Sequence, residues 1–330
     1  MRFGRLLVSS ALVLGWVSIA HGAKVPEAEA SLRVAVIGDI NSSYGSLEYS
    51  PRVHAALSRI VELAPDLVIG VGDLVAGQRP RPPLDRDSLE AMWRQFRRTV
   101  LEPLHEAGIP FAPVPGNHDA SALPGFELER RIFGQFWGRH RPTLDLLEGG
   151  SYPFRYAFVV SGNLFVVLDA TVGGPLAETQ RRWLEDVLRG GESHGARVAA
   201  AHLPLHPFTH GREHEFLADP ALEGLLSEAG VDLFLSGHHH AFYPGFRAGF
   251  MQVSQGCLGS GPRRLLGENR RSPQSFTMIT IQSSGKVSVR ALTGTDFNEV
   301  VDLRDLPPRL RHAGREIVRE DLVRPAHAAK

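Results

Sequence analysis

The chain has 330 residues, of which 43% are hydrophobic and 22% charged, a composition typical of a globular core with a solvated surface. This composition excludes a disordered, a fibrous or a polytopic membrane protein. The 36 basic residues balance 36 acidic ones, so there is no excess of positive charge to gather polyanions, and generic nucleic-acid binding is disfavoured.

Residues 1–22 have the pattern of a secretory signal peptide. Arginines stand at positions 2 and 5, residues 6–20 are nearly all apolar, and Ala20-His21-Gly22 offers small residues for cleavage. An uncleaved membrane anchor is the alternative, but residues 6–20 fall short of the roughly twenty that span a bilayer. We expect a mature chain beginning near Ala23 without a transmembrane segment, residues 23–30 as a linker, and a periplasmic or extracellular location.

Cys257 is the only cysteine, so the chain cannot form an intramolecular disulfide. The fold must be stabilised by its core even in an oxidising compartment. We interpret Cys257 itself as a small buried hydrophobic residue.

Short apolar runs alternate with amphipathic segments in the first third of the chain, as in strand-helix-strand units. The predicted elements are, in chain order, strand 32–38, helix 51–63, strand 66–72, helix 88–107 kinked near Pro103, and strand 110–114. Each strand is followed by a polar residue or a polar cluster. Open α/β sheets bind ligands beyond the carboxyl ends of their strands, so these polar ends should meet in space.

The rest of the chain continues with mixed elements and ends in a charged segment. The predicted elements are a hairpin over 155–160 and 164–168, helix 178–188, strand 197–201, helix 221–228, strand 231–235, and antiparallel strands 276–281 and 287–292. Residues 79–83 and 259–273, rich in Gly, Pro and Arg, are expected as surface loops. Residues 301–330 are expected as a charged C-terminal tail.

Five predicted strand ends carry oxygen and imidazole donors and no thiol. They are Asp39, Asp73, Asn117-His118-Asp119, His202 and His238-His239-His240. Carboxylate, amide oxygen and neutral imidazole together suit Mn, Fe, Zn, Ni or Co, and the lack of thiolate argues against a structural zinc site. The sequence therefore predicts a metal centre at these strand ends.

The ordered set Gly38-Asp39-Ile40-Asn41, Gly72-Asp73, Gly116-Asn117-His118-Asp119, Ala201-His202 and Gly237-His238-His239-His240 resembles the signature of the calcineurin-like metallophosphoesterases. Any one of these motifs says little, but the ordered set is highly specific. The resemblance covers residues 32–292. It implies an α/β fold of two mixed β-sheets packed as a sandwich with flanking helices, in a catalytic domain over residues 31–300.

The resemblance also implies a role for each residue in hydrolysis of a phosphate monoester or diester. Two divalent or trivalent ions (Mn, Fe, Zn or Mg) would share a hydroxide that attacks phosphorus. Asp73 would bridge the ions, with Asp39 and His240 on one, and Asn117, His202 and His238 on the other. His118 would be the acid, oriented by Asp119.

One position departs from the family pattern. Asn41 stands where the first motif usually has a histidine. An amide oxygen still coordinates a metal but is a harder and weaker donor than imidazole, which shifts the expected ion toward Mn or Mg or weakens occupancy. Purple acid phosphatases also lack this histidine and use a tyrosine after the Gly-Asp pair. Here Leu74-Val75-Ala76 follows that pair, which leaves only Tyr44 as a remote candidate.

Candidates for substrate binding lie in the loops. His206 follows His202 closely enough to line a pocket, and Arg79 and Arg81 follow the second strand end, from which they could bind phosphate oxygens. A solvated proline-rich loop is the alternative for the two arginines. His239 stands between two predicted ligands and is expected to point away from the metals.

Two other classes of protein remain open. Asn41 could mark a degenerate site in a noncatalytic metal- or phosphoester-binding module of the same fold. The chain could also be an envelope protein that stores phosphate or metal. His118 beside six predicted ligands favours the enzyme, because a binding protein has no use for the acid.

Overall fold

The structure, a computed structural model, describes residue 1 and residues 31–190, 194–259 and 261–323. The predicted signal peptide and linker lie outside the described residues, except for Met1. The chain from Ser31 onward clusters into one unit. In the described ranges, no helix is long and apolar enough to cross a membrane.

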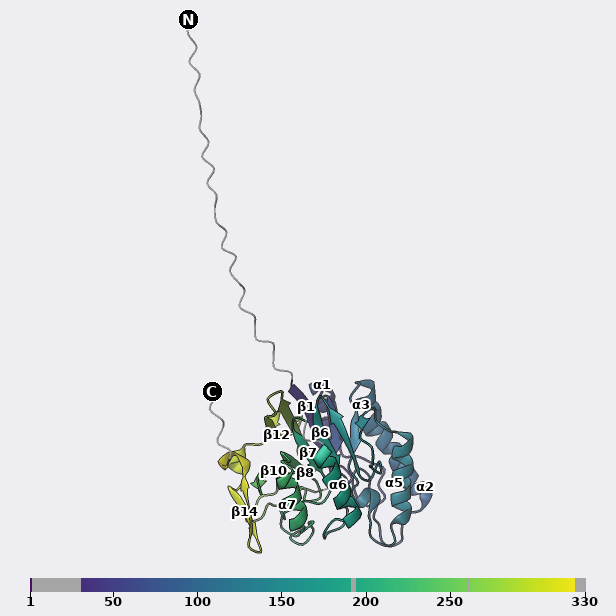
Figure 1. Cartoon of the computed structure of the whole chain (residues 1–330). Helices are drawn as coiled ribbons and strands as arrows, with labels where there is room; N and C mark the ends of the chain where they lie inside the picture. Colours follow the sequence, from purple (N-terminus) through teal and green to yellow (C-terminus); the bar gives the residue numbers. More distant parts are fainter. Residues whose placement is uncertain (2–30, 191–193, 260, 324–330) are drawn as a thin grey trace. The chain divides into compact units, whose positions relative to one another are not determined.

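The first β-sheet has six strands in the order β13-β12-β11-β1-β2-β3. Two of its strands, β12 and β1, are labelled in Figure 1. β1, β2 and β3 run parallel, and β11, β12 and β13 extend the sheet beyond β1 in antiparallel fashion. The strands are β1 (Ser31–Ile37), β2 (Leu67–Gly70), β3 (Phe111–Pro113), β11 (Phe276–Gln282), β12 (Val287–Thr293) and β13 (Glu299–Val300). Because β1 to β3 are parallel, their carboxyl ends lie at one edge of the sheet.

The second β-sheet has nine strands in the order β14-β15-β9-β10-β8-β7-β6-β5-β4. Neighbouring strands are parallel from β6 through β7 and β8 to β10, and antiparallel outside this block. The strands are β4 (Asp145–Leu146), β5 (Tyr156–Val160), β6 (Asn163–Val167), β7 (Arg197–Ala200), β8 (Leu233–Ser236), β9 (Tyr243–Arg247), β10 (Phe250–Ser254), β14 (Arg309–His312) and β15 (Arg315–Arg319).

The two sheets pack face to face through an apolar layer that draws side chains from both. Val36 of β1 belongs to the same buried cluster as Phe165 of β6 and Leu235 of β8. Its neighbour Ala35 belongs instead to a second cluster, under the helices. This alternation follows from the two-residue period of a strand, and it explains why strands covered on both faces are apolar throughout. The predicted fold class, two mixed sheets in a sandwich with flanking helices, is confirmed.

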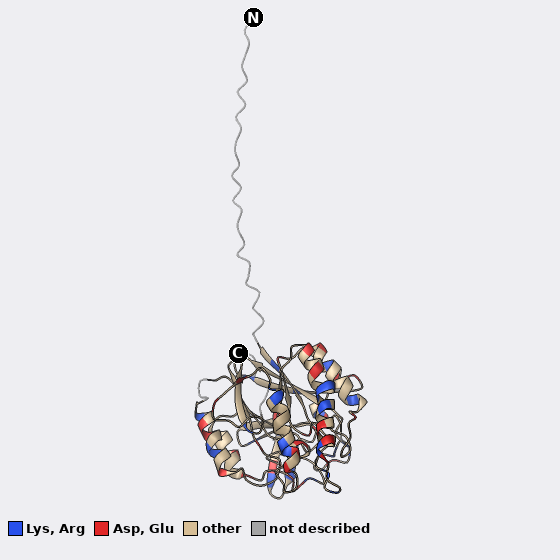
Figure 2. Ribbon diagram, turned by 90° about the vertical axis from the view of Figure 1, so that its right-hand side faces the viewer, with Lys and Arg blue, Asp and Glu red and all other residues tan. Residues whose placement is uncertain are grey.

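Helices cover the outer faces of both sheets, α1, α2 and α5 with the first and α6 and α7 with the second. Their exposed sides carry mixed charges of both signs (Figure 2). The helices are α1 (Pro51–Leu63), α2 (Arg86–Phe96), α3 (Glu102–Glu106), α4 (Asn117–Ala120), α5 (Glu127–Arg139), α6 (Glu178–Gly190) and α7 (Pro220–Glu228), with 3₁₀ turns at Leu303–Asp305 and Glu320–Leu322.

The predicted kink near Pro103 takes the form of a π-helical turn. Arg97–Leu101 separates α2 from α3, so the single helix expected over 88–107 is three consecutive segments. Pro103 has no N–H to donate, and the chain before it is already helical, so its ring crowds the carbonyl of Thr99 four residues earlier, within the π-helical turn. The interruption of the helical ladder therefore falls just before the proline.

The segment expected as a charged tail is instead part of the second sheet as far as residue 323. β15 pairs with β9 and β14 pairs with β15. Arg319 anchors this hairpin, because its buried guanidinium donates to the carbonyls of Leu303 and Leu306. Charged side chains alternate with buried Leu310 and Ile317 here, and the charges hid the strand pattern.

Candidate metal centre

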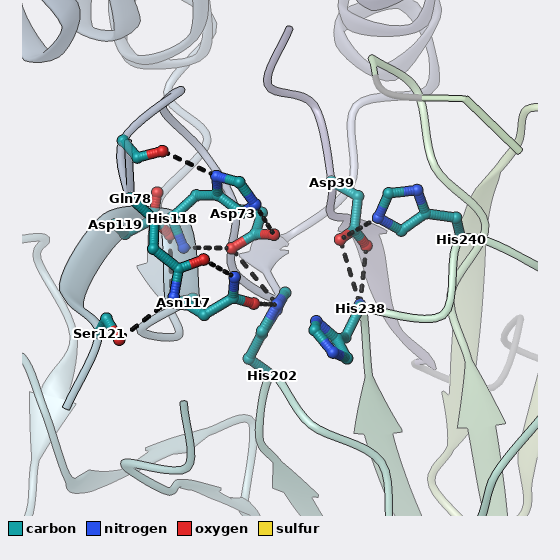
Figure 3. A network of polar contacts seen from close by, with 12 residues as sticks. Asp39, Asp73, Gln78, Asn117, His118, Asp119, Ser121, His202, His238 and His240 are labelled. Atoms are coloured by element: carbon teal, nitrogen blue, oxygen red, sulfur yellow. Dashed lines mark hydrogen bonds and ion pairs between the residues drawn. The ribbon is translucent and has the colours of Figure 1, made fainter. Parts of the chain in front are cut away.

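The six residues predicted as the principal metal ligands all lie just beyond strand ends, and the fold brings them together (Figure 3). Asp39 and Asp73 follow β1 and β2, Asn117 opens α4 after β3, and His202, His238 and His240 follow β7 and β8. We refer to these six residues as the donor cluster. Each is at least nine-tenths buried. Parallel strands in both sheets place their carboxyl ends at the same edge, which explains the convergence.

On one side of the donor cluster, three acceptor atoms face one another. His202 Nδ1 donates to the carbonyl of Val71 at 2.8 Å, so the lone pair of a neutral His202 lies on Nε2. This Nε2 lies 2.8 Å from Asn117 Oδ1 and 3.3 Å from Asp73 Oδ1. Lone pairs at these separations repel unless a cation, either a proton or a metal ion, lies among them.

The amide of Asn117 is oriented from outside the donor cluster. Its Nδ2 donates to Gln78 Oε1 at 2.6 Å, and Gln78 Nε2 donates in turn to Ser121 Oγ at 3.3 Å. Because the amide nitrogen is held in this way, Oδ1 is the atom turned toward His202. No motif in the sequence points to Gln78.

The same arrangement recurs around Asp39. His240 Nδ1 donates to the carbonyl of Gly261 at 3.1 Å, and Nε2 lies 3.1 Å from Asp39 Oδ1. The backbone N–H of His238 donates to both carboxylate oxygens of Asp39, at 3.0 and 3.1 Å. The geometry thus offers a second place where an imidazole lone pair meets a carboxylate oxygen.

Four members of the donor cluster adopt backbone conformations that are rare for residues other than glycine. The φ angles are +50° at Asp39, +54° at Asp73, +65° at His238 and +53° at His240. Such conformations each cost of order 1 kcal/mol or more and concentrate at functional sites. Gly116 provides the close approach that this packing needs, because a Cβ there would lie 2.1 Å from the backbone nitrogen of Asp73.

The pKa values of Asp73 and His202 are shifted by the same close contacts. Burial opposes ionisation of Asp73, but the nearby imidazoles of His202 and His118 prevail and hold the pKa of Asp73 well below its usual range. Burial lowers the pKa of His202, but the Asp73 carboxylate outweighs it and raises that pKa to about 9. The Asp73 carboxylate therefore favours positive charge among the three facing acceptors.

Two further buried atoms are suited to a metal ion. Asn41 Oδ1 and His238 Nδ1 are buried, and neither has a hydrogen-bond partner among the residues that the structure describes. Burying an unpaired acceptor is costly, so each calls for a ligand. Asp73, His202 and His238 also place ligand atoms within 4.8 Å of one another. Carboxylate, amide and imidazole donors of this kind fit Mn, Fe, Zn or Mg.

His118 and Asp119 have different surroundings from those expected. His118 Nδ1 donates to the carbonyl of Gly77 at 2.9 Å, and its Nε2 lies 3.8 Å from Asp73 Oδ2. Asp119 does not orient His118. Its Oδ1 accepts from the N–H groups of Leu74 and Val75 and its Oδ2 from that of Gly116. Asp119 therefore ties together the turns that carry Asp73 and Asn117.

A pocket of about 460 Å³ opens over the cluster, within the usual range for small-molecule sites. Its lining includes Asp73, His118 and His240 together with Asn41 and Tyr44. The ring of Tyr44 stacks on that of His118, with centroids 5.3 Å apart, and Tyr44 is exposed. Tyr44 thus borders the pocket as an aromatic wall.

The residues predicted to bind substrate are not among those lining this pocket. Arg79 Nε donates to the carbonyl of Pro82, and Arg81 is exposed in the proline-rich loop. His206 is fully buried, with Nδ1 donating to the carbonyl of Pro207. His239 points away from the centre as predicted, since its Nε2 donates to the carbonyl of Glu215.

Arginines from two other loops line the pocket instead. Arg212, Arg263 and Arg271 line the pocket, and we refer to them as the arginine rim. Arg212 pairs with Glu215, whose Oε2 accepts from His238 Nε2 at 2.9 Å. This hydrogen bond leaves Nδ1 of His238 as its free lone pair, the arrangement by which carboxylates commonly orient metal-binding histidines. Only the abundance of arginine in residues 259–273 hinted at the rim.

The family model described as calcineurin-like phosphoesterase matches residues 32–242, and the chain belongs to this family. The chain is 26% identical over 224 residues to probable purple acid phosphatase 20 of Arabidopsis thaliana, covering 66% of this chain and 48% of that protein. It is 29% identical over 150 residues to a probable cyclic nucleotide phosphodiesterase of Psychrobacter sp. (strain PRwf-1), covering 43% and 36%. The chain thus spans half or less of the length of these curated relatives.

Among solved structures, a purple acid phosphatase from yellow lupin (Lupinus luteus) seeds has the same fold. It matches with a TM-score of 0.60 at 17% sequence identity, covering 83% of this chain and 53% of that one.

Proposed function

We propose that the chain hydrolyses phosphate esters, monoesters or diesters, with a dinuclear metal centre held by the donor cluster. The observation that carries this proposal is the occurrence of two places where buried acceptor atoms face each other, one around Asp73 and one around Asp39. When bound, two metal ions would lower the pKa of a shared water to give a hydroxide nucleophile and would offset charge on the phosphate oxygens. The named relatives, a probable phosphatase and a probable phosphodiesterase, support this class of reaction.

The family resemblance implies an assignment of donors to the two ions, and the short distances around Asp73 and Asp39 support it. Asp39 and His240 would hold one ion, Asn117, His202 and His238 the other, and Asp73 would stand between them. Asn41 would add its unpartnered oxygen from the pocket side.

His118 is the side chain that would protonate the leaving group. In hydrolysis a water oxygen bonds to phosphorus, the bond from phosphorus to the leaving oxygen breaks, and the leaving oxygen takes up a proton. Gly77 accepts from Nδ1 of His118, and the imidazole borders the pocket, so Nε2 is the atom available to carry that proton. Asp119 would act through the backbone, by fixing the turns that carry the donors.

A noncatalytic module that binds a metal ion or a phosphoester is the second candidate, and the feature that favours it is Asn41. The place of His118 beside the pocket argues for the enzyme. From residues 1–22 we further propose that the protein is exported and acts on an ester in the cell envelope or outside the cell.

The experiment is hydrolysis of p-nitrophenyl phosphate and bis-p-nitrophenyl phosphate after the metal is stripped and Mn, Zn, Fe or Mg is restored. Asp73→Asn is compared with Asp66→Asn, since Asp66 stands at the opposite end of β2 and its carboxylate accepts from the backbone of Arg33. We expect metal-dependent turnover that is lost in Asp73→Asn and kept in Asp66→Asn. A folded protein that binds metal but turns over neither ester would favour the noncatalytic module.

A further inference from the structure

The arginine rim concentrates positive charge at the pocket of a chain whose net charge is zero. Arg212 comes from the loop after β7, and Arg263 and Arg271 come from the loop between β10 and β11. All three line the same pocket as His118 and Asp73. The charge is therefore local, and it faces the place where a phosphate would bind.

The three arginines differ in how far the protein neutralises them. Arg212 has an acidic partner in Glu215. Arg271 donates to the carbonyl of Pro262, which carries no charge. Within the described ranges, the guanidinium of Arg263 forms neither an ion pair nor a hydrogen bond, and its Nε is buried.

Leaving Arg263 in this position is unfavourable without an anion. Its side chain is half-buried, and burial together with the charge of Arg212 lowers the pKa of Arg263. The carboxylates of Glu215 and Asp39 offset this lowering only in part, and a buried donor without a partner costs free energy that a bound anion recovers. A guanidinium presents several donors in a plane and is matched to the oxygens of a phosphoryl group.

We propose that Arg263, assisted by Arg271, binds the terminal oxygens of the substrate's phosphoryl group and makes the site selective for phosphate monoesters over diesters. This inference rests on the proposed function and narrows its substrate. A monoester carries three terminal oxygens and close to two negative charges at neutral pH, whereas a diester carries two terminal oxygens and one charge. A diester would also have to place its second ester group against the arginine rim, where the ester oxygen is an uncharged and weaker acceptor than a terminal phosphoryl oxygen.

The test compares Arg263→Gln and Arg263→Lys with the wild type and with Arg270→Gln. Arg270 is a suitable control because it belongs to the same loop but is exposed and lies 3.9 Å from Asp305, away from the pocket. For each protein we would measure kcat/KM on p-nitrophenyl phosphate and on bis-p-nitrophenyl phosphate, metal content, melting temperature, and the affinity for inorganic phosphate by calorimetry.

We expect the wild type to prefer the monoester. Arg263→Gln should lower kcat/KM by about 10- to 100-fold for the monoester and by about 3-fold or less for the diester. The affinity for inorganic phosphate should fall by a factor similar to that for the monoester. Arg263→Lys should show a smaller loss of monoester activity, because it keeps the positive charge and loses only the planar pair of guanidinium donors. Arg270→Gln should match the wild type.

The inference is overturned if Arg263→Gln changes both esters by the same factor, if the wild type prefers the diester, or if phosphate affinity is unchanged in the variant. Failure of the proposed function looks different, because the wild type would then turn over neither ester with any metal. In that case calorimetry with inorganic phosphate still decides whether Arg263 binds the anion.

Discussion

The donor cluster and the arginine rim face the same pocket but are built in opposite ways. Donor-cluster residues stand within a few positions of a strand end, are buried, and are held by backbone groups of neighbouring turns. The rim residues stand in two long loops, are half-buried or exposed, and have few partners. A cluster of this kind fixes which reaction is possible, whereas a rim of this kind sets which substrate is accepted.

His118 lies where the two regions meet, and its removal should give the largest effect on turnover. We expect His118→Ala to lower kcat by about 10² to 10⁴-fold while metal content stays unchanged, because a positioned acid contributes about that factor. The loss should be greater for phenyl phosphate than for p-nitrophenyl phosphate, whose leaving group needs less protonation. Steady-state kinetics on both esters measures this.

The matched control is His54→Ala, an exposed histidine on α1. Equal losses on the two esters would indicate that His118 positions substrate or metal and is not the acid.

His206 provides a test in the loop that leads to the rim. Burial lowers the pKa of His206 to about 4, and its Nε2 has no partner within the described part of the chain. Between about pH 6.5 and pH 4, His206 is therefore protonated in the unfolded state and neutral in the folded state. The free energy of unfolding falls as the pH falls through this window. The contribution of His206 is present above about pH 6.5 and is lost on acidification.

We expect His206→Gln to flatten this dependence by about 2 to 3 kcal/mol between pH 7 and pH 4, measured by urea denaturation of the metal-free protein. The exposed His54→Gln should leave the slope as in the wild type. Parallel curves for His206→Gln and the wild type would show that His206 titrates normally in the folded protein.

Glu215 links the rim to the donor cluster through His238. We expect Glu215→Gln to weaken metal binding by about 10- to 100-fold, since a carboxylate that orients a metal-binding histidine contributes about this much. Competition with a chromophoric chelator, without substrate, measures the change. Glu213→Gln is the matched control, because Glu213 stands in the same loop and its carboxylate pairs with His210 at 3.5 Å. Unchanged metal affinity in Glu215→Gln would confine its role to neutralising Arg212.

The same contrast explains how much could be predicted from the sequence. Asp39 and Asp73 follow apolar runs with a clear strand pattern, so both the parallel strands and the convergence of their ends were predictable. Glu215 contacts His238 from another loop, and Arg263 lines a pocket built from segments far apart in the chain; no local spacing encodes either placement. The alternating burial of β15 was hidden for a related reason, because its charged side chains resemble a solvated tail.

Helix α5 was missed although its apolar residues are abundant. Phe133, Phe136 and Trp137 pack against Trp93 of α2, and this aromatic cluster is formed between helices from separate segments. Arg79 and Arg81, expected to bind phosphate, are not among the residues that line the pocket, for a similar reason. Proximity in sequence to Asp73 does not determine where a loop turns, and Arg79 folds back onto Pro82.

Asn41 gives the smallest expected effect and the sharpest distinction between a metal ligand and a structural residue. In the metal-free protein its buried Oδ1 is unpaired within the described residues, so Asn41→Ala removes an unfavourable group and should leave the melting temperature unchanged or slightly higher. In the metal-loaded protein the same change removes a donor and should reduce the stabilisation that the metal provides, by about 1 kcal/mol. Thermal denaturation with and without Mn measures both changes in melting temperature.

Asn163→Ala, which loses hydrogen bonds far from the pocket, should destabilise both forms equally. If Asn41→Ala behaves in the same way, Asn41 is a structural residue and the ligand set is complete without it.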